Sequence, residues 1–347
     1  MRFSWVSKDL LGGVSMADNN SGSSSGESSD SPTTSFLKCR ETFLSSSDDD
    51  DSTISSVTQE QNIKTRFQEP GFNLSRSESW MNFPVLSDET VGAMVEKESE
   101  HLPKYDYLYR LHSGDLDLTA RNDALDWNLE AWNHFGFGPL CLCLSMNYFD
   151  RFLSAHTLPV VLQRDAKWAT QLLALSCLRL AMKAEETTTP HPLDLQDVVP
   201  SKYLFEAKSV HRMERLVLHI LKWRMKSITP CSYIDYFLSK LNDDQCPSKD
   251  NVFKAVHIIL RILRGIDFLQ FRPSEIAAAV ALYISGEQQA VSKIDDAMSC
   301  FKSEGKSRVL HCLAMINDLE KNLITEEPES PSGVLDAASL SRKLDRN

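Results

Sequence analysis

The sequence predicts an all-α protein, and three of its features support that prediction. No glycine occurs between Pro139 and Arg264. Prolines divide that stretch into segments rich in leucine, alanine and methionine, which is typical of helices joined by short connections. Strand patterns, in which apolar and polar residues alternate between Asn-Gly or Asp-Gly turns, are missing. Because the helical pattern restarts near Ser227, it predicts two consecutive bundles of about five helices each.

The helices of the first bundle follow one another closely. An amphipathic opening helix is expected over 88–112, with Asp88 as its N-cap. The next helix is expected over 118–135, with Thr119 as a candidate cap, and a turn containing two glycines ends it. The remaining helices are expected at 140–155, 165–185, 193–199 and 202–222.

The helix at 165–185 is expected to be the central one of this bundle. Its stretch from Trp168 to Met182 is apolar almost all round, with Arg179 as the only charge. A helix without a polar face is normally buried. After Thr229-Pro230 the second bundle begins, with helices expected at 231–241, 249–267, 273–286, 290–300 and 305–323.

Both ends of the chain are expected to be disordered. Residues 1–84 are rich in serine, contain the acidic run Asp48–Asp51 and hold few large apolar residues, so they cannot offset the entropy of ordering. The acidic tail at 324–347 has a similar composition. Between them, we expect a first helical fold at 85–226 and a second at 227–323.

Composition narrows the class of protein. The net charge of −11 argues against a protein that grips nucleic acid through its phosphates. The eight cysteines form no CxxC pair, so we expect reduced core thiols rather than disulfides or zinc ligands. The sequence shows no secretory signal and no apolar stretch long enough to span a membrane. A soluble intracellular protein without a membrane or nucleic-acid partner is therefore expected.

The side chains that perform enzyme chemistry are not grouped in this sequence. The nine histidines are scattered, and there is no HExxH, GxSxG or Walker motif. The paired carboxylates Glu185 and Glu186 end a helix, where a solvated pair is the simpler interpretation. We therefore expect no catalytic residues, no metal and no cofactor, and a function based on binding.

Four motifs in order resemble the cyclin box: RNDALDW at 121–127, NYFDRFL at 147–153, LAMKAEE at 180–186 and RMERLVL at 212–218. The flanking segments HLPKYDYL and LKWRMKSITPCSYIDYF resemble those of the D-type cyclins of plants. The resemblance extends over 85–320. It implies two consecutive five-helix cyclin folds and a regulatory subunit, not itself an enzyme, that activates a cyclin-dependent protein kinase at the G1/S transition.

The resemblance also implies a kinase-binding site. In the family, the first fold docks beside the αC helix of the kinase and shifts the kinase towards its active conformation. Lys183 and Glu214 match the family's paired kinase-contact positions. An intramolecular salt bridge, or two solvated charges, is the alternative interpretation of these residues. Replacing both residues by alanine is expected to abolish kinase binding while the protein stays folded, because removing both leaves no buried charge unpaired.

A second site implied by the resemblance is the groove that captures basic-x-leucine motifs of substrates and kinase inhibitor proteins. Trp127 and Gln171 match its positions. The Met, Ile and Leu usual on its floor are replaced by Ala120, Asp123 and Ala124. Less apolar surface and an added charge predict weak docking. Nearby Arg121 is expected to be structural, paired with Asp123 or with Asp150.

The N-terminal arm carries an LxCxE motif at Leu37, Cys39 and Glu41. In an extended strand these three side chains share one face, so they can enter a partner's groove together. The resemblance implies that this partner is the retinoblastoma-related protein. Ser31 and Ser330 each precede a proline and are candidate phosphorylation sites, with unmodified linker as the alternative. Nuclear localisation, with a cytoplasmic share, also rests on the resemblance.

A twin-cyclin-fold transcription factor without a kinase partner is the alternative function. Such a protein shares the helical architecture but binds DNA and polymerase, so it needs a basic face and commonly a zinc ribbon. This sequence indicates neither of them.

Overall fold

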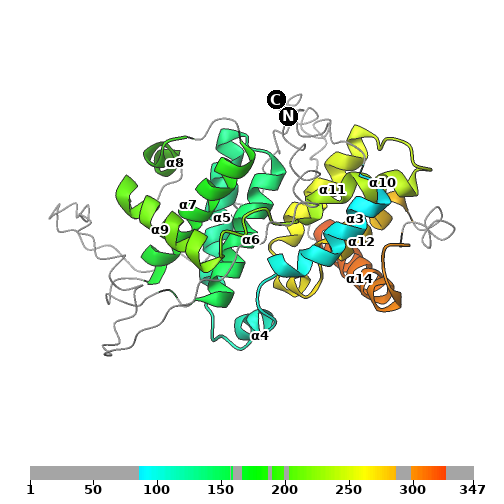
Figure 1. Cartoon of the computed structure of the whole chain (residues 1–347), viewed down its shortest axis with the longest axis horizontal. Coiled ribbons are helices and arrows are strands. Elements are labelled where there is room, and N and C mark those ends of the chain that lie inside the picture. Colours follow the sequence, from blue (N-terminus) through cyan, green and yellow to red (C-terminus); the bar gives the residue numbers. More distant parts are fainter. Residues whose placement is uncertain are drawn as a thin grey trace, which may run out of the picture.

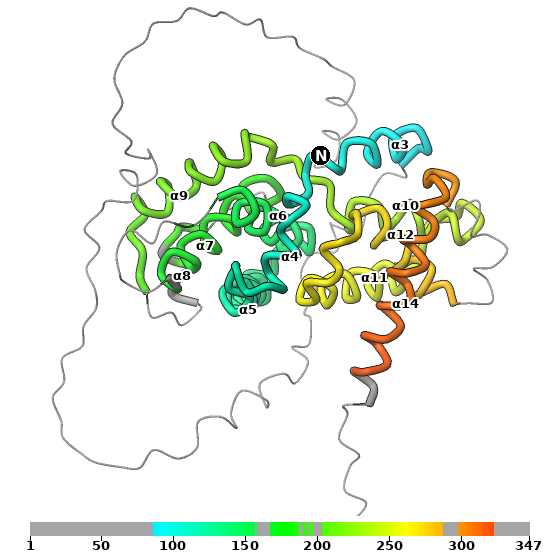
Figure 2. The backbone as a smooth tube through the Cα atoms, turned by 90° about the horizontal axis from the view of Figure 1, so that it is seen from below, coloured from blue at the N-terminus to red at the C-terminus, as the bar shows by residue number. Residues whose placement is uncertain are grey.

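The computed structural model describes residues 86–156, 158, 166–186, 190–198, 203–286 and 298–325. Every regular element within these residues is a helix, which confirms the all-α prediction. The helices form two bundles side by side, the first drawn in green and the second in yellow to orange (Figure 1, Figure 2). The helix expected at 290–300 falls mainly outside the described residues, and its last three residues form a turn.

The single opening helix expected over 88–112 is wrong, because the segment is divided into three pieces: α3 Asp88–Lys97, the 3-10 helix η3 Glu98–His101 and α4 Tyr107–His112. Pro103 explains the break, since it disfavours helical geometry at the residue before it. Leu102 is accordingly extended, with φ −88° and ψ 153°. The cap also differs from expectation. It is Ser87, whose hydroxyl accepts the backbone N–H of Thr90 at 3.3 Å.

The cap of the next helix, α5 (Leu118–Phe135), lies two residues before the expected one. The Asp117 carboxylate accepts the backbone N–H groups of Thr119 at 2.9 Å and Ala120 at 3.3 Å, so Thr119 is not the cap. A carboxylate at this position also interacts favourably with the helix dipole. The helix ends at Gly136, whose left-handed φ of 67° suits glycine.

The rest of the first bundle surrounds α7, as expected. Its remaining helices are α6 Pro139–Ala155, α7 Ala166–Glu185, α8 Pro192–Val198 and α9 Ala207–Ile220. Helix α7 contacts α5, α6 and α9, and it is buried along most of its length. Helix α9 begins later than expected, because Gln196 bonds both backbone groups of Phe205 and holds the approach extended.

The second bundle surrounds α12. Its elements are η4 Pro230–Ser232, α10 Ile234–Leu241, α11 Lys249–Ile262, η5 Ile266–Gln270, α12 Pro273–Ser285 and α14 Ser303–Thr325. The helix expected over 249–267 ends early, at Ile262. A side chain at Gly265 would place its Cβ 2.9 Å from the Phe268 ring, so the chain needs glycine where it turns into η5.

Two buried arginines hold the bundles together. Arg121 forms a bidentate pair with Asp150, at 2.8 and 3.0 Å, and donates to the Leu263 carbonyl of the second bundle at 3.0 Å. The pairing with Asp150, rather than Asp123, resolves the expectation for Arg121. Arg151 donates to the Arg224 carbonyl at 2.9 Å and to the Ser227 hydroxyl at 2.7 Å. The connecting segment is therefore fixed to α6.

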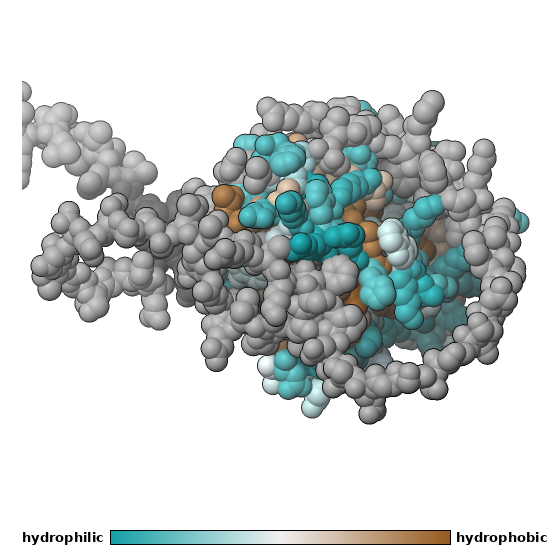
Figure 3. All heavy atoms as spheres, turned by 60° about the vertical axis from the view of Figure 1, so that its left-hand side comes forward, coloured by the Kyte–Doolittle hydropathy of each residue, from teal (hydrophilic) through white to brown (hydrophobic). Residues whose placement is uncertain are grey.

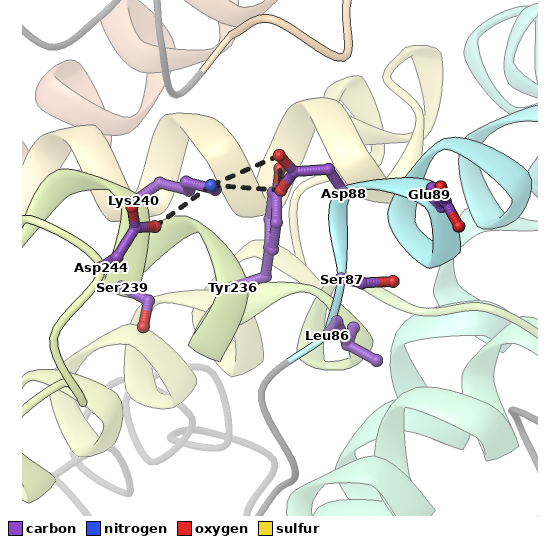
Figure 4. A pocket seen from close by; sticks show the side chains of 8 residues that line it. All are labelled: Leu86, Ser87, Asp88, Glu89, Tyr236, Ser239, Lys240 and Asp244. Atoms are coloured by element: carbon purple, nitrogen blue, oxygen red, sulfur yellow. Dashed lines mark hydrogen bonds and ion pairs between the residues drawn. The ribbon is translucent and has the colours of Figure 1, made fainter.

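The opening helix α3 packs against the second bundle although it precedes the first in sequence (Figure 2). Asp88 accepts the Tyr236 hydroxyl at 3.0 Å and pairs with Lys240 at 3.1 Å. These side chains, with Asp244, border a pocket of about 540 Å³ (Figure 4). Further along, Glu98 is fully buried and accepts the backbone N–H and the hydroxyl of Ser274 at 3.0 and 2.8 Å. The segment thus acts as a strap across the second bundle.

The cysteines are free thiols among the described residues, as expected. Five of them are buried: Cys141, Cys143, Cys177, Cys231 and Cys312. Cys246 departs from the expectation of core thiols, because it is exposed in the turn after α10.

Candidate functional site

Lys183 and Glu214 lie together at the end of α7 and in the middle of α9. The ammonium group of Lys183 is 2.7 Å from Oε2 of Glu214. A third residue, Arg179, binds the other carboxylate oxygen, with its Nε 2.9 Å from Oε1. Arg179 also donates to the Pro190 carbonyl at 2.9 Å. Glu214 therefore joins two cations that are one turn apart on α7, and we call these three residues the ion triad.

The members of the ion triad differ in exposure. The side chains of Arg179 and Glu214 are each 6% exposed, whereas that of Lys183 is 41% exposed. The triad thus has a buried half and a surface half. An ammonium group has three donors, and within the described residues Lys183 uses one of them, on Glu214. Its other donors can reach a partner without breaking the buried Arg179–Glu214 bond.

The geometry corrects one sequence expectation about this site. Lys183 and Glu214 form the intramolecular pair considered as an alternative, but the pair is not self-contained. Replacing both residues would leave Arg179 buried without its carboxylate, which is costly. The sequence motifs did not predict that Arg179 belongs to this site. Its position as the only charge in an apolar helical stretch was the signal that could have revealed a buried partner.

The residues expected at the substrate groove lie on two helices, Trp127 and Asp123 on α5 and Gln171 on α7. Trp127 is buried on α5, and its indole N–H has no acceptor among the described residues. Gln171 lies half-buried on α7. Asp123 is 59% exposed and 3.8 Å from Lys167, so its charge lies at the surface rather than in a floor.

Several predicted sites lie outside the described residues. They are the LxCxE motif at Leu37, Cys39 and Glu41, and the two candidate phosphorylation sites at Ser31 and Ser330. In the described part, no three histidine, cysteine, aspartate or glutamate side chains are grouped to hold a metal ion. None of the described helices is long and apolar enough to cross a membrane.

Two models of known protein families match this chain. The family model for the cyclin N-terminal domain matches residues 89–226, and the model for the cyclin C-terminal domain matches 228–331. These ranges cover more than half of the chain, and they correspond to the two bundles. The chain therefore belongs to the cyclin family, whose members are regulatory subunits in the cell cycle and not enzymes themselves.

Curated relatives identify the kind of cyclin that the chain resembles. Cyclin-D4-2 of Arabidopsis thaliana is 47% identical over 253 residues, which cover 72% of this chain and 83% of the relative. Cyclin-D4-1 of Arabidopsis thaliana is 46% identical and covers 82% of this chain and 87% of itself. Cyclin-D3-1 of Oryza sativa subsp. japonica is 44% identical, with 78% and 81% covered. The resemblance to plant D-type cyclins is thus confirmed.

Among solved structures, a viral cyclin from herpesvirus saimiri aligns with a TM-score of 0.47 at 15% identity. The alignment covers 58% of this chain and 86% of that one. The family assignment rests on the family models and the curated relatives.

Proposed function

We propose that this chain binds and activates a cyclin-dependent protein kinase and directs it to a retinoblastoma-related protein, promoting the G1/S transition. Membership in the cyclin family and the similarity to plant D-type cyclins support the proposal. The observation that carries the kinase site is the half-exposed Lys183, held beside the buried Glu214 at the family's paired contact positions.

The proposed role of the ion triad is to orient the kinase. Arg179 fixes Glu214, and Glu214 fixes Lys183, so the ammonium group is positioned before the partner arrives. Preorganised donors cost less to order on binding and set the register of the complex. The chain supplies no reacting group. It activates by binding the active kinase conformation more tightly than the inactive one.

Kinase activation is tested by reconstitution. The purified chain is titrated into a cyclin-dependent kinase that has little activity alone, with a retinoblastoma-related fragment as substrate. We expect phosphorylation to rise with the chain's concentration and to saturate when the kinase is fully bound. If the kinase stays inactive while size-exclusion chromatography shows no complex, the proposal fails for that kinase, and other kinases of the same organism are tested in turn.

We also propose that the protein acts in the nucleus, with a cytoplasmic share. A regulatory role in the cell cycle supports nuclear action, although the sequence has no long basic run of the kind that marks nuclear import. Imaging a fluorescent fusion in dividing cells tests this. Nuclear enrichment before DNA replication is expected, and strict exclusion from the nucleus at that stage would contradict it.

A further inference from the structure

The solvent side of α9 consists of basic side chains. Every exposed residue of this helix is a lysine, an arginine or a histidine: Lys208, His211, Arg215 and His219. They recur at intervals of three or four residues, so they lie in one row along one face of the helix. We call these four residues the α9 basic row.

The α9 basic row faces away from the core and has no carboxylate partner in the described structure. Met213 and Val217, on the opposite side of the helix, are fully buried. None of the four side chains of the row forms an ion pair within the described residues. The only acid in the sequence of α9 is Glu214, which is buried and already bonded to both cations of the ion triad. A positive strip therefore lies on a chain whose net charge is −11.

The row also borders a hollow beside the ion triad. Lys208, His211 and Arg215 line a surface depression of about 440 Å³, together with Arg212 and Glu214. Helix α9 is on the left of Figure 1, and Figure 3 brings that side of the molecule forward, where the described residues are mostly hydrophilic. An open depression lined by charged side chains suits a polar extended segment better than an apolar helix. Because Glu214 lines it, the hollow adjoins the proposed kinase contact.

The length and charge of the row favour an acidic protein segment as its ligand. Lys208 and His219 are 11 residues apart, so the row is about 16 Å long, which about five residues of extended chain cover. Ammonium and guanidinium groups donate strong hydrogen bonds to carboxylate oxygens. Nucleic acids and anionic membranes are poorer candidates, because their binding usually takes a larger cluster of lysines and arginines.

We propose that the α9 basic row binds an acidic segment of a protein substrate, next to the docked kinase. This role rests on the proposed function. A substrate held beside the ion triad stays close to the kinase, so its effective concentration at the active site rises. The α5 surface gives such a second docking site a purpose. It offers little apolar surface to a basic-x-leucine motif, with Asp123 59% exposed, whereas the row selects substrates of the opposite charge.

Binding of an acidic peptide to the full chain tests the site without a kinase. The probe is a fluorescent peptide of about eight glutamates, long enough to cover the row, and a glycine-serine peptide of equal length is the uncharged control. Fluorescence anisotropy at low salt gives the dissociation constants. The test variant carries Lys208→Gln with Arg215→Gln. The matched variant loses the same charge through Lys254→Gln with Lys302→Gln, which are exposed on α11 and ahead of α14.

We expect the test variant to bind the acidic peptide about fivefold more weakly than the wild type, as the loss of two exposed ion pairs implies. The matched variant should bind as the wild type, and all three proteins should show the same circular dichroism. Equal affinity of the test variant and the wild type, or no binding by the wild type, would overturn the proposal. So would equal weakening in the matched variant, which would show a general charge effect. An oligonucleotide of equal length that binds the row more tightly than the peptide would assign it to nucleic acid and overturn the proposal as well.

Phosphorylation kinetics with the reconstituted kinase complex test the docking role. For a substrate with an acidic segment near its target residue, the test variant should raise KM about fivefold and leave kcat unchanged. For the same substrate with its acidic residues replaced by amides, the test variant and the wild type should behave alike. An unchanged KM in an active complex would overturn the substrate role. A wild-type chain that binds the peptide but activates no kinase would contradict the proposed function and leave the acidic-segment site intact.

Discussion

Glu214 is a carboxylate divided between a buried and a surface partner. Arg179 satisfies one oxygen in the interior, and Lys183 satisfies the other at the rim. The two bonds therefore differ in what they do for the protein. The buried bond stabilises the fold, since neither charge can be rehydrated there. The rim bond contributes little to stability and leaves Lys183 available to a partner.

This division predicts unequal effects on stability. Glu214→Ala should destabilise the protein by about 3–5 kcal/mol, because it strands Arg179 in the core. Lys183→Ala should cost about 1 kcal/mol or less, as for a surface pair. Urea unfolding monitored by circular dichroism measures both. Equal losses of unfolding free energy for the two variants would show that the Lys183–Glu214 bond is needed for the fold and that Lys183 is not available to a partner.

The folding stability is expected to depend on pH through Asp235, which lies in the first turn of α10. Burial raises its pKa from 3.8 to about 7, and its carboxylate forms no hydrogen bond within the described residues. The folded state therefore holds its proton to a higher pH than the unfolded state, so its contribution to stability falls as the pH rises from about 4 to about 7.

Asp235→Asn should remove this pH-dependent loss of stability, because asparagine does not ionise. The variant should therefore gain stability over the wild type as the pH rises from about 4 to about 7. Urea midpoints on either side of the folded-state pKa, at about pH 5 and about pH 7.5, measure this. Asp250→Asn is the control, because Asp250 is exposed in the first turn of α11. Parallel pH profiles for Asp235→Asn and the wild type would contradict the interpretation.

At the residue scale, the sequence could indicate which charges matter but not how they pair. Arg121 had two candidate partners in sequence, and only packing against α6 selects Asp150. Arg179 was visible as an isolated charge, yet its partner lies on another helix 35 residues away. Caps were missed by one or two residues, since Ser87 and Asp117 compete with neighbours of similar capping strength.

Among the elements, the strap formed by α3 and η3 is stabilised by Glu98. Its carboxylate is fully buried and accepts hydrogen bonds from Ser274 of α12 and from the Tyr233 hydroxyl at 3.2 Å. Burial raises the pKa of Glu98, while the Ser274 hydrogen bonds favour its charged form. The strap therefore depends on one side chain that joins distant parts of the chain.

Glu98→Ala should cost about 3–5 kcal/mol, because it leaves buried donors of Ser274 and Tyr233 unpaired. Glu96→Ala, an exposed position on the same strap, should stay within about 0.5 kcal/mol of the wild type. Chemical denaturation compares the two variants. A cost for Glu98→Ala as small as that of Glu96→Ala would mean that the strap does not support the second bundle.

The side chains of α5 are expected to bind basic-x-leucine peptides only weakly. With Asp123 exposed and small residues at the neighbouring positions, little apolar surface is offered to a leucine side chain. A basic-x-leucine peptide from a substrate or a kinase inhibitor protein should bind with a dissociation constant above about 100 μM, or less than about 5.5 kcal/mol. Calorimetric titration decides this, and low-micromolar affinity would show that other residues form the groove.

At the element scale, the sequence predicted the existence and order of the helices better than their ends. The sequence located α5, α6 and α7 within a residue or two, because periodicity and composition agree there. The break at Pro103 was missed because amphipathic spacing continues across it. The early end of α11 depends on the contact between Gly265 and the Phe268 ring, which no local pattern reveals.

For the whole molecule, the two bundles behave as one scaffold. Arg121 and Arg151 link the first bundle to the second and to the connecting segment through buried hydrogen bonds. A partner that docks on α7 and α9 therefore meets a surface whose position relative to the second bundle is fixed. The LxCxE motif is outside the described residues, and we expect it to recruit its partner independently of the two bundles.

That independence gives a prediction for the proposed retinoblastoma-related partner. Cys39→Ala with Glu41→Ala should weaken binding to the pocket domain at least about tenfold, since a few anchors carry most of the energy of such segments. Kinase binding should be unchanged. Lys38→Ala with Arg40→Ala is the matched control, because these side chains face the other way in an extended strand. Surface plasmon resonance with the full chain measures the affinity of the wild type and of both double variants for the pocket domain. If the Cys39/Glu41 variant binds as tightly as the wild type, the motif is not used.

At the scale of function, the sequence motifs were sufficient for the family but not for the geometry of the site. Four ordered motifs, each on its own helix, are specific enough to indicate a cyclin by themselves. The half-exposed state of Lys183 and the buried role of Arg179 depend on how α7 packs against α9. Such side-chain geometry arises only when distant segments meet.

Lys183 is the proposed kinase contact, and the ion triad holds its ammonium group in position. The most direct test is the affinity of the Lys183→Ala chain for its kinase, with Lys167→Ala as control, since Lys167 is 72% exposed on the same helix. We predict at least about tenfold weaker binding for Lys183→Ala, as when a hydrogen-bonded charge at an interface is removed. Lys167→Ala should bind as the wild type, and both variants should keep native helicity. Wild-type affinity and kinase activation by folded Lys183→Ala would contradict the account.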